Sequence, residues 1–585
     1  MAPSSLASNS ADCSVTKADR QVPADPRPDR DRPKRASQIL WILLLVVIAL
    51  AWNAPLMYPG RHGIFDWLKD IYFLHFFHGA VADYHTIPLS FLWFPRAIAE
   101  YPSAYTVSYW ANPEVPTFSP LAVLSLFLPT LAAFKVVIAL HLSAGALGIG
   151  LVSRRAGLGP GGTLGLLLCT LLNPWLAQHV AIGYTSWISA CLVPLIVALL
   201  SGRPTVAALA GASALDALIL YQGGLHVFLW FNAALACVAV FMAVLDRDLG
   251  PLRRPGLLLA LTGVLALPKL WAVAAAFRGI ERMMAHSYAS IADLWGLLTD
   301  ARSDPFKFPE AANMHGTAIY DASTVMGTWF LVLVALALLL LAFRAWRSRG
   351  RAVPGLSLHI GLVATAALCV ALGWQGVWAA AVRVVPTLNA QIHPHRFLFV
   401  AVFLLAVFIV LEIDRLARRL PGWWKEITMV LVFLPVLVVL GPRNRFMAET
   451  AAARPDALSS FSLKGVLSQV ITATREDGTP LPVSASPSGA RIDLDGYSEP
   501  ILLPWLSTKA QRENFQVVGA VVEEKGDAVA PLRLVPQRGA VVVELRAKEY
   551  GRLPLVGVGL ALWLAILLLW GRTIPRPRPV SAPPR

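Results

Sequence analysis

Long apolar runs recur from one end of the chain to the other, and no other feature limits the possible folds so strongly. Twelve of these runs are long enough, at about 18 residues or more, to cross a bilayer as helices. Only 15% of the 585 residues are charged, whereas a soluble protein carries about 25%. The sequence therefore predicts a polytopic α-helical membrane protein. We place its spans at residues 38–56, 131–152, 161–178, 183–201, 204–221, 225–245, 256–273, 327–346, 357–382, 397–414, 424–441 and 553–570.

Positive charge gathers at alternate connections between these spans. Arginine and lysine favour the cytoplasmic side of a membrane, and placing every basic connection there puts both chain termini in the cytoplasm. The net charge is +15, but the basic residues flank apolar runs instead of forming a face for nucleic acid, so we expect no nucleic-acid partner. The basic connections hold Arg154, Arg155, Arg203, Arg247, Arg253, Arg254, Arg344, Arg347, Arg349, Arg351, Arg415, Arg418, Arg419 and Lys425.

The charge bias also defines the domains. The first apolar run ends in WNAPLMYPG without a small-residue cleavage site, so we expect an anchor and not a removed signal peptide. The short apolar segment 117–131 should be re-entrant or interfacial, because a crossing there would reverse every later basic loop. The predicted parts are a disordered cytoplasmic tail (1–37), a transmembrane domain (38–441) with external loops 57–130 and 274–326, an external β-rich domain (442–552), a final transmembrane helix (553–570) and a cytoplasmic tail (571–585).

Residues 442–552 carry a different pattern from the rest of the chain. Short β-type runs such as GARIDL, FQVVGAVV and GAVVVELR alternate with turn signals such as EDGT and PSG. This pattern predicts a small antiparallel β-sandwich or jelly roll.

The order of these parts, together with several local motifs, resembles a known group of membrane enzymes. GIFDWLKD follows the first span, FSPLAVLSLFLPTL precedes a span that ends in a double arginine, and HVAIGYTSWISACLVPL and YQGGLHVFLW form two external turns. PTLNAQIHPHRFLFV places an arginine at the external mouth of a late span. In this order the motifs resemble those of the bacterial GT-C-type glycosyltransferases, specifically the YfhO-like membrane proteins.

This resemblance implies an inverting enzyme of the bacterial inner membrane that moves a sugar from a polyprenyl-phosphate carrier to a glycan, lipid or protein acceptor of the cell envelope. Such a transfer passes through an oxocarbenium-like transition state. The acceptor hydroxyl must lose a proton to a fixed base, and the departing lipid phosphate needs a cation, preferably the forked guanidinium of arginine. The sequence names no cofactor with certainty and leaves a divalent cation open.

The first motif supplies two carboxylates. Asp66 and Asp70 are four residues apart and would share one face of a helix. We expect Asp66 to be the base and Asp70 its substitute, because the FDW context of Asp66 carries the resemblance. The alternative is that Asp66 only caps an interfacial helix. His75 and His78 could bind a metal with these aspartates, or could simply be hydrogen-bonded packing residues.

Arg396 is the predicted cation for the lipid phosphate. It lies at the external mouth of a span beside His393 and His395, and the alternative is an interfacial arginine that snorkels to water. His179 and His226 lie in charge-free external turns that should face the same cavity. Each is interpreted either as a donor-binding residue or as a buried, hydrogen-bonded histidine.

The remaining polar residues have simpler interpretations. Asp216 and Lys269 lie within spans, where charge is costly, and should face the interior of the bundle. They either pair with each other for stability, or Lys269 lines a groove for the lipid phosphate. Asp83, Glu100 and Glu114, in the first external loop, are interpreted as solvated loop charges.

Two other classes of function stay open. A transporter or flippase would have internal repeats and paired broken helices at the midplane, and the sequence has no such symmetry. A non-enzymatic scaffold would bind a partner through its β domain and use the loop carboxylates as helix caps. An enzyme requires Asp66, Arg396 and His226 to converge, whereas a scaffold does not.

Overall fold

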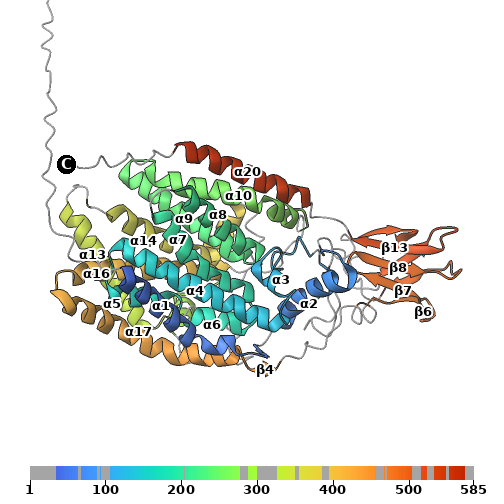
Figure 1. Ribbon diagram of the computed structural model, residues 1–585, viewed down its shortest axis with the longest axis horizontal. Helices are drawn as coiled ribbons and strands as arrows, with labels where there is room; N and C mark the ends of the chain where they lie inside the picture. The colour runs from blue at the N-terminus through green and yellow to red at the C-terminus, as the bar shows by residue number, and fades with distance from the viewer. Residues whose placement is uncertain are drawn as a thin grey trace, which may run out of the picture. The chain divides into compact units, whose positions relative to one another are not determined.

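Helices form most of the structure, and two small β-sheets follow near the end of the chain (Figure 1). This computed structural model describes residues 35–63, 67–88, 92–93, 106–107, 109–202, 205–276, 287–299, 326–348, 353, 355–384, 394–455, 467, 471–503, 515–523, 532–547 and 553–573. The chain divides into residues 1–41 and 42–585, and every contact discussed below lies within the second unit.

The helices range from single turns to one of 29 residues. Those labelled η are 3₁₀ helices, which are wound more tightly than α-helices. They are α1 (Arg35–Trp52), η1 (Ala54–Met57), α2 (Trp67–Tyr84), α3 (Pro120–Leu124), α4 (Thr130–Ala156), α5 (Pro160–Thr170), α6 (Pro174–Ala181), η2 (Thr185–Leu192), α7 (Val193–Ser201), α8 (Val206–Tyr221), α9 (Leu225–Asp246), α10 (Gly250–Ala276), α11 (Ile291–Thr299), α13 (Thr328–Ser348), α14 (Leu356–Gly373), α15 (Gln375–Val384), η5 (Pro394–Arg396), α16 (Phe397–Ala417), α17 (Gly422–Thr450) and α20 (Leu553–Thr573).

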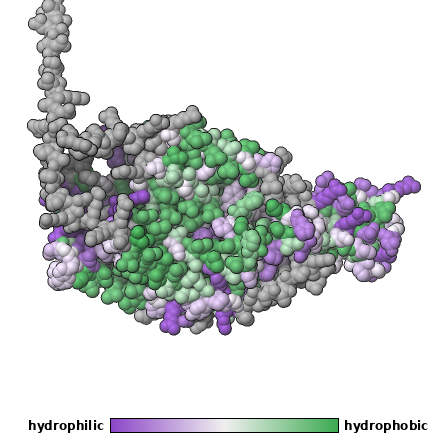
Figure 2. Space-filling view, in the orientation of Figure 1, coloured by the Kyte–Doolittle hydropathy of each residue, from purple (hydrophilic) through white to green (hydrophobic). Residues whose placement is uncertain are grey.

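The predicted fold class is confirmed: the chain is a polytopic helical membrane protein with a small antiparallel β domain. Among the described residues, nine helices are long and apolar enough to cross a membrane. Three shorter apolar helices, Ser37–Trp52, Thr185–Ser201 and Val206–Tyr221, lie at the other predicted spans. The visible surface over the helices is mostly hydrophobic, whereas the strands carry many hydrophilic residues (Figure 2). An apolar outer face of this kind suits contact with lipid.

Two predicted spans are interrupted, because local capping decides where a helix ends and hydropathy does not report it. In the span predicted at 161–178, α5 ends and Asn173 starts α6. The side-chain oxygen Oδ1 of Asn173 accepts a hydrogen bond from the backbone N–H of Trp175 at 2.8 Å. The span predicted at 357–382 is broken at Trp374, between α14 and α15.

Two further segments differ in length. The helix α17 continues to Thr450, so the boundary expected at residue 442 falls inside a helix. The segment 117–131, which we expected not to cross, holds the five-residue helix α3, far too short for a span.

The helices α5 and α6 form the centre of the helical domain. Their combined segment is almost completely buried, and α17 packs on both of them. Around them α4 packs on α7, α14 packs on α9 and α16, and α10 packs on α8 and α20. Most of α13 and α20 and most of the apolar part of α17 are exposed, which suits these helices to contact with lipid.

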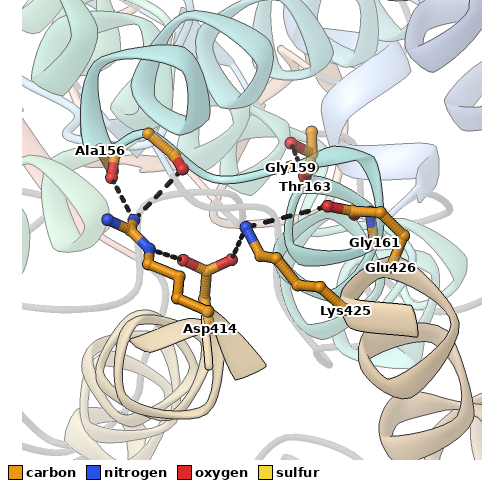
Figure 3. Close-up of polar contacts among 9 residues, drawn as sticks. Ala156, Gly159, Gly161, Thr163, Asp414, Lys425 and Glu426 are labelled. Atoms are coloured by element: carbon orange, nitrogen blue, oxygen red, sulfur yellow. Dashed lines mark hydrogen bonds and ion pairs between the residues drawn. The ribbon is translucent and has the colours of Figure 1, made fainter. Parts of the chain in front are cut away.

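A polar network ties several helix ends together at the C-terminal end of α16 (Figure 3). The carboxylate of buried Asp414 accepts hydrogen bonds from Arg418 Nε at 2.8 Å and pairs with Lys425 Nζ at 2.9 Å. Arg418 also donates to carbonyl oxygens at the end of α4. Glu426 accepts a hydrogen bond from the backbone N–H of Gly161, in the first turn of α5, at 2.7 Å. Because these contacts satisfy exposed helix-end groups, they fix the end of α16 against α4, α5 and α17.

The β domain consists of two antiparallel sheets. The strand orders are β10-β13-β8-β7 and β11-β12-β9-β5-β6. Along β12, Leu532 and Leu534 are buried while Val535 is exposed, the alternation of a strand with one face in a core. The strands are β5 (Ala473–Arg475), β6 (Pro480–Leu481), β7 (Val483–Ser486), β8 (Gly489–Asp493), β9 (Ile501–Leu503), β10 (Phe515–Val518), β11 (Ala520–Glu523), β12 (Leu532–Pro536) and β13 (Val542–Ala547), with two-residue pairs β1 (Arg61–His62) with β4 (Arg454–Pro455) and β2 (Leu92–Trp93) with β3 (Thr106–Val107) in the helical part.

Reporter fusions test the orientation of the bundle, which rests on the charge bias alone. We expect a reporter inserted at Arg349 to report the cytoplasm and one inserted within residues 480–490 to report the external side, because basic connections stay in the cytoplasm. Paired alkaline phosphatase and green fluorescent protein fusions measure this. The same side for both positions would contradict the topology.

Candidate functional site

Trp187 lies at the centre of an aromatic cluster at the end of the bundle where η2, α9 and α16 begin. The ring of Trp187 stacks on His179, with centroids 4.5 Å apart, and meets Trp230 edge-on at 5.2 Å. The ring centroid of Tyr184 lies 5.7 Å from that of Trp187, and the ring centroid of His226 lies 6.2 Å from it. These five residues are the aromatic cluster, and two predicted histidines, His179 and His226, belong to it.

Arg396 lies over this cluster. Its guanidinium carbon Cζ is 4.9 Å from the ring centroid of Trp187 and 5.2 Å from that of Tyr184, contacts that stabilise a cation by about 0.5–2 kcal/mol. Arg396 is 6% exposed, and an arginine this buried is not described by snorkelling. The neighbouring His395 is buried too, whereas His393 lies outside the described residues.

Asp70 joins α2 to the start of η2. Its carboxylate oxygen Oδ2 accepts hydrogen bonds from the backbone N–H of Thr185, at 3.3 Å, and from the hydroxyl of Thr185. Asp70 is buried, and a buried carboxylate is tolerated only where donors of this kind meet it. Since Thr185 directly follows Tyr184 of the aromatic cluster, Asp70 lies beside the site and helps to position it.

Glu114 forms an ion pair with Lys69, the neighbour of Asp70 on α2. Glu114 Oε2 is 2.9 Å from Lys69 Nζ, and the Glu114 side chain is 46% exposed. The ammonium of Lys69, with smaller effects of His226 and Arg396, holds the pKa of the Glu114 carboxyl well below its usual value. Glu114 is therefore an exposed loop charge, as we expected, but it is paired with Lys69 and not solvated alone.

The loop 109–117, which carries Glu114, is anchored to α10 by two hydrogen bonds. Lys269 Nζ donates to the carbonyl oxygen of Asn112 at 2.8 Å, and the indole N–H of Trp110 donates to the carbonyl oxygen of Pro268 at 3.3 Å. Lys269 is completely buried, and its ammonium group contacts the loop instead of water. Binding of a lipid phosphate by Lys269 stays a prediction.

The turn between α8 and α9 also contacts this loop. The backbone N–H of Thr117 donates to the carbonyl oxygen of Tyr221 at 2.7 Å. Gly223 has a φ of +91°, and a Cβ added to it would lie 2.2 Å from the carbonyl oxygen of Glu114. Only glycine can adopt this positive φ so close to another backbone. The Gly-Gly turn therefore fixes the position of the Glu114 backbone.

The predicted pairing of Asp216 with Lys269 is wrong. Asp216 Oδ1 accepts a hydrogen bond from Asn232 Nδ2 on α9 at 3.1 Å, while Lys269 donates to the loop. Each buried charge has its own partners because helix rotation, which the sequence does not report, turns the two side chains to different neighbours.

Lys269→Met is expected to loosen the loop 109–117. Methionine keeps much of the volume but removes the ammonium donor and leaves the carbonyl of Asn112 only the longer hydrogen bond from the backbone N–H of Val115, at 3.4 Å; the loss costs about 1–3 kcal/mol. Amide hydrogen exchange within the loop should then rise about 5- to 150-fold. Lys135→Met is the matched control, because Lys135 is also buried but donates to the carbonyl of Leu56 on η1. Unchanged exchange in Lys269→Met would contradict the anchoring role.

Asp66 lies outside the described residues, but described residues on both sides of it are held against α6. A Cβ added to Gly63 would lie 2.1 Å from the carbonyl oxygen of Ala181. The indole N–H of buried Trp67 donates to the carbonyl oxygen of Val180. Gly63 and Trp67 therefore both lie at the end of α6, which leads into the aromatic cluster.

The arrangement of the described residues does not support a metal site. Among the described residues, no group of three or more His, Cys, Asp or Glu side chains is arranged to hold a metal ion. The ring atom Nδ1 of His78 lies 2.8 Å from the carbonyl oxygen of Ser125, as the packing alternative requires. A divalent cation stays a prediction, since residues 64–66 lie outside the described ranges.

The sequence matches no protein-family model and no curated protein. The structure is similar to the cryo-EM structure of the mycobacterial arabinofuranosyltransferase AftD, with a TM-score of 0.42 and 17% sequence identity. The match covers 70% of this chain and 27% of the AftD chain. We draw no functional conclusion from a likeness at this level.

Sequence reasoning missed Glu114, Lys69 and Trp187. The sequence offered one weak signal, an acidic residue within the aromatic segment YWANPEVP. Its neighbours at the site come from segments far apart in the chain, so their meeting depends on the packing of the bundle.

Proposed function

We propose that this protein is a membrane glycosyltransferase that moves a sugar from a polyprenyl-phosphate-linked donor to a cell-envelope acceptor at the external face of the inner membrane. The observation that carries the proposal is buried Arg396 stacked on two aromatic rings, with the carboxylates of Asp70 and Glu114 nearby, at the end where three helices begin. An arginine fixed on a flat platform, with carboxylates close to it, suits a substrate that is both anionic and rich in hydroxyl groups.

The phosphate of the donor is the group that Arg396 would bind. A guanidinium presents a planar fork that matches two phosphate oxygens. The N-terminal ends of η2, α9 and α16 add the positive ends of their helix dipoles, which favour an anion at the same place. As the sugar leaves, the phosphate keeps its negative charge, and a fixed cation stabilises that charge without reorganisation.

The base of the reaction would be Asp66. The acceptor hydroxyl must be deprotonated as it attacks the sugar carbon, and a positioned carboxylate does this. The substitute residue, Asp70, has an oxygen bonded to both donors of Thr185, which favours a positioning role for it. Attack from the face opposite the departing phosphate would make the transfer inverting.

A reconstituted assay tests the proposal. The purified protein in lipid nanodiscs is mixed with undecaprenyl phosphates that carry a labelled hexose or pentose, and with a bacterial envelope extract as the source of acceptor. We expect protein-dependent movement of label from lipid to acceptor and release of undecaprenyl phosphate. The absence of transfer from every donor of the panel would refute it, whereas movement of the intact lipid between leaflets would identify a flippase.

A further inference from the structure

The donor has a second chemical part, its sugar ring, and a second part of the site fits it. Resting on the proposed function, we infer that the Lys69–Glu114 ion pair binds hydroxyl groups of the donor sugar while Arg396 binds the phosphate. The aromatic cluster lies under the arginine. Gly223, three residues before His226 of this cluster, packs against the backbone of Glu114, and Asp70, which follows Lys69, accepts a hydrogen bond from Thr185, which follows Tyr184. The ion pair is therefore close to the phosphate position yet separate from it.

Glu114 combines a fixed backbone with an open side chain. Its loop is tied to α10 by Lys269 and to the turn before α9 by Gly223 and Thr117. Its backbone N–H also donates to the side-chain oxygen of Asn112 at 2.9 Å. Such anchoring is unnecessary for a solvated charge, whereas a residue that must meet a substrate atom needs it. Nearly half of the side chain stays exposed and can meet a ligand.

The pair offers what a sugar hydroxyl needs. A hydroxyl donates one hydrogen bond and accepts others, so a carboxylate and an ammonium side by side satisfy both functions. Among the described residues, Glu114 Oε2 pairs with Lys69, and no hydrogen bond to Oε1 is present. Hydrogen bonds to charged groups are also the stronger ones.

Binding, and not proton transfer, is the role that suits Glu114. A general base works best when its pKa lies near the operating pH. The ammonium of Lys69 holds the pKa of Glu114 well below that range, which makes this carboxylate a permanent hydrogen-bond acceptor and a weak base.

Two lipid probes separate the sugar from the phosphate. Undecaprenyl phosphate and undecaprenyl-phosphate-mannose are titrated into the protein in nanodiscs, with tryptophan fluorescence as the readout, since Trp187 and Trp230 lie in the site. We expect Glu114→Gln and Lys69→Gln to raise the Kd of the mannose-linked lipid about tenfold or more, and to leave the Kd of bare undecaprenyl phosphate unchanged. Arg396→Ala should weaken both lipids.

Glu449→Gln is the matched control. Glu449 forms an exposed ion pair with Arg445 at the same 2.9 Å distance, and its loss should change neither Kd. Equal weakening of both lipids in Glu114→Gln, or equal wild-type affinity for the two lipids, would overturn the inference. Wild-type preference for the mannose-linked lipid without any transfer would refute the proposed function and leave the sugar-binding pair standing. Size-exclusion profiles confirm that each variant is folded.

Discussion

Asp66→Asn is expected to lower sugar transfer by about 10²–10⁴-fold, the contribution of a positioned acid or base, while the protein stays folded in the membrane. Asparagine has nearly the same size but cannot take the proton of the acceptor hydroxyl. It also caps a helix about as well as aspartate, so the capping alternative predicts near-normal activity for the same variant. The measurement is transfer from a polyprenyl-phosphate donor, normalised to protein level.

Asp70→Asn is the internal control for this prediction. Asp70 accepts both hydrogen bonds from Thr185 at one oxygen. An asparagine oxygen has two lone pairs and can still accept both, but more weakly because it carries no charge. We therefore expect a much smaller loss, accompanied by lower thermal stability. Full activity in Asp66→Asn, or a loss confined to Asp70→Asn, would mean that the base has been assigned to the wrong residue.

Arg396→Ala should raise the Kd for undecaprenyl phosphate about 10- to 150-fold, the value of a hydrogen bond to a charged group. Arg396→Lys should fall between the wild type and alanine, because lysine keeps the charge but loses the two-point fork and the stack on Tyr184 and Trp187. Fluorescence titration and the donor KM both measure the effect.

Arg383→Ala provides the comparison for Arg396. Arg383 is an exposed arginine in the last turn of α15, so its removal changes the net charge equally without touching the aromatic cluster. If both alanine variants weaken lipid binding to the same extent, the effect is general surface charge, and Arg396 has no specific role.

The helical fold could be predicted because its signals are local. An apolar run of about 18 residues can be recognised without knowledge of any other part of the chain. Twelve such runs correspond to apolar helices. Helix ends were harder, since the break at Asn173 depends on one side-chain hydrogen bond. The continuation of α17 to Thr450 carried no hydropathy signal either.

The site was predictable only in part. Arg396 and His226 could be selected as candidates because polar residues at the ends of apolar runs are conspicuous, and the structure places both next to Trp187. Their roles stay predictions. The partners of Lys269 and Glu114 could not be identified in the same way. Those partners are backbone carbonyls and side chains from distant segments, and which of them meet depends on helix rotation and loop closure.

The helix α16 connects the aromatic cluster to the polar network of Figure 3. Arg396 directly precedes its first residue, and Asp414 and Arg418 hold its last turns. From 396 to 414 the helix rises about 27 Å. Because the far end is fixed, one inserted or deleted residue would swing Arg396 by about 100° around the helix axis, off its platform of rings. Substitutions along α16 that keep its packing leave that angle unchanged. Substitutions within this helix are therefore tolerated in evolution far more easily than a change in its length.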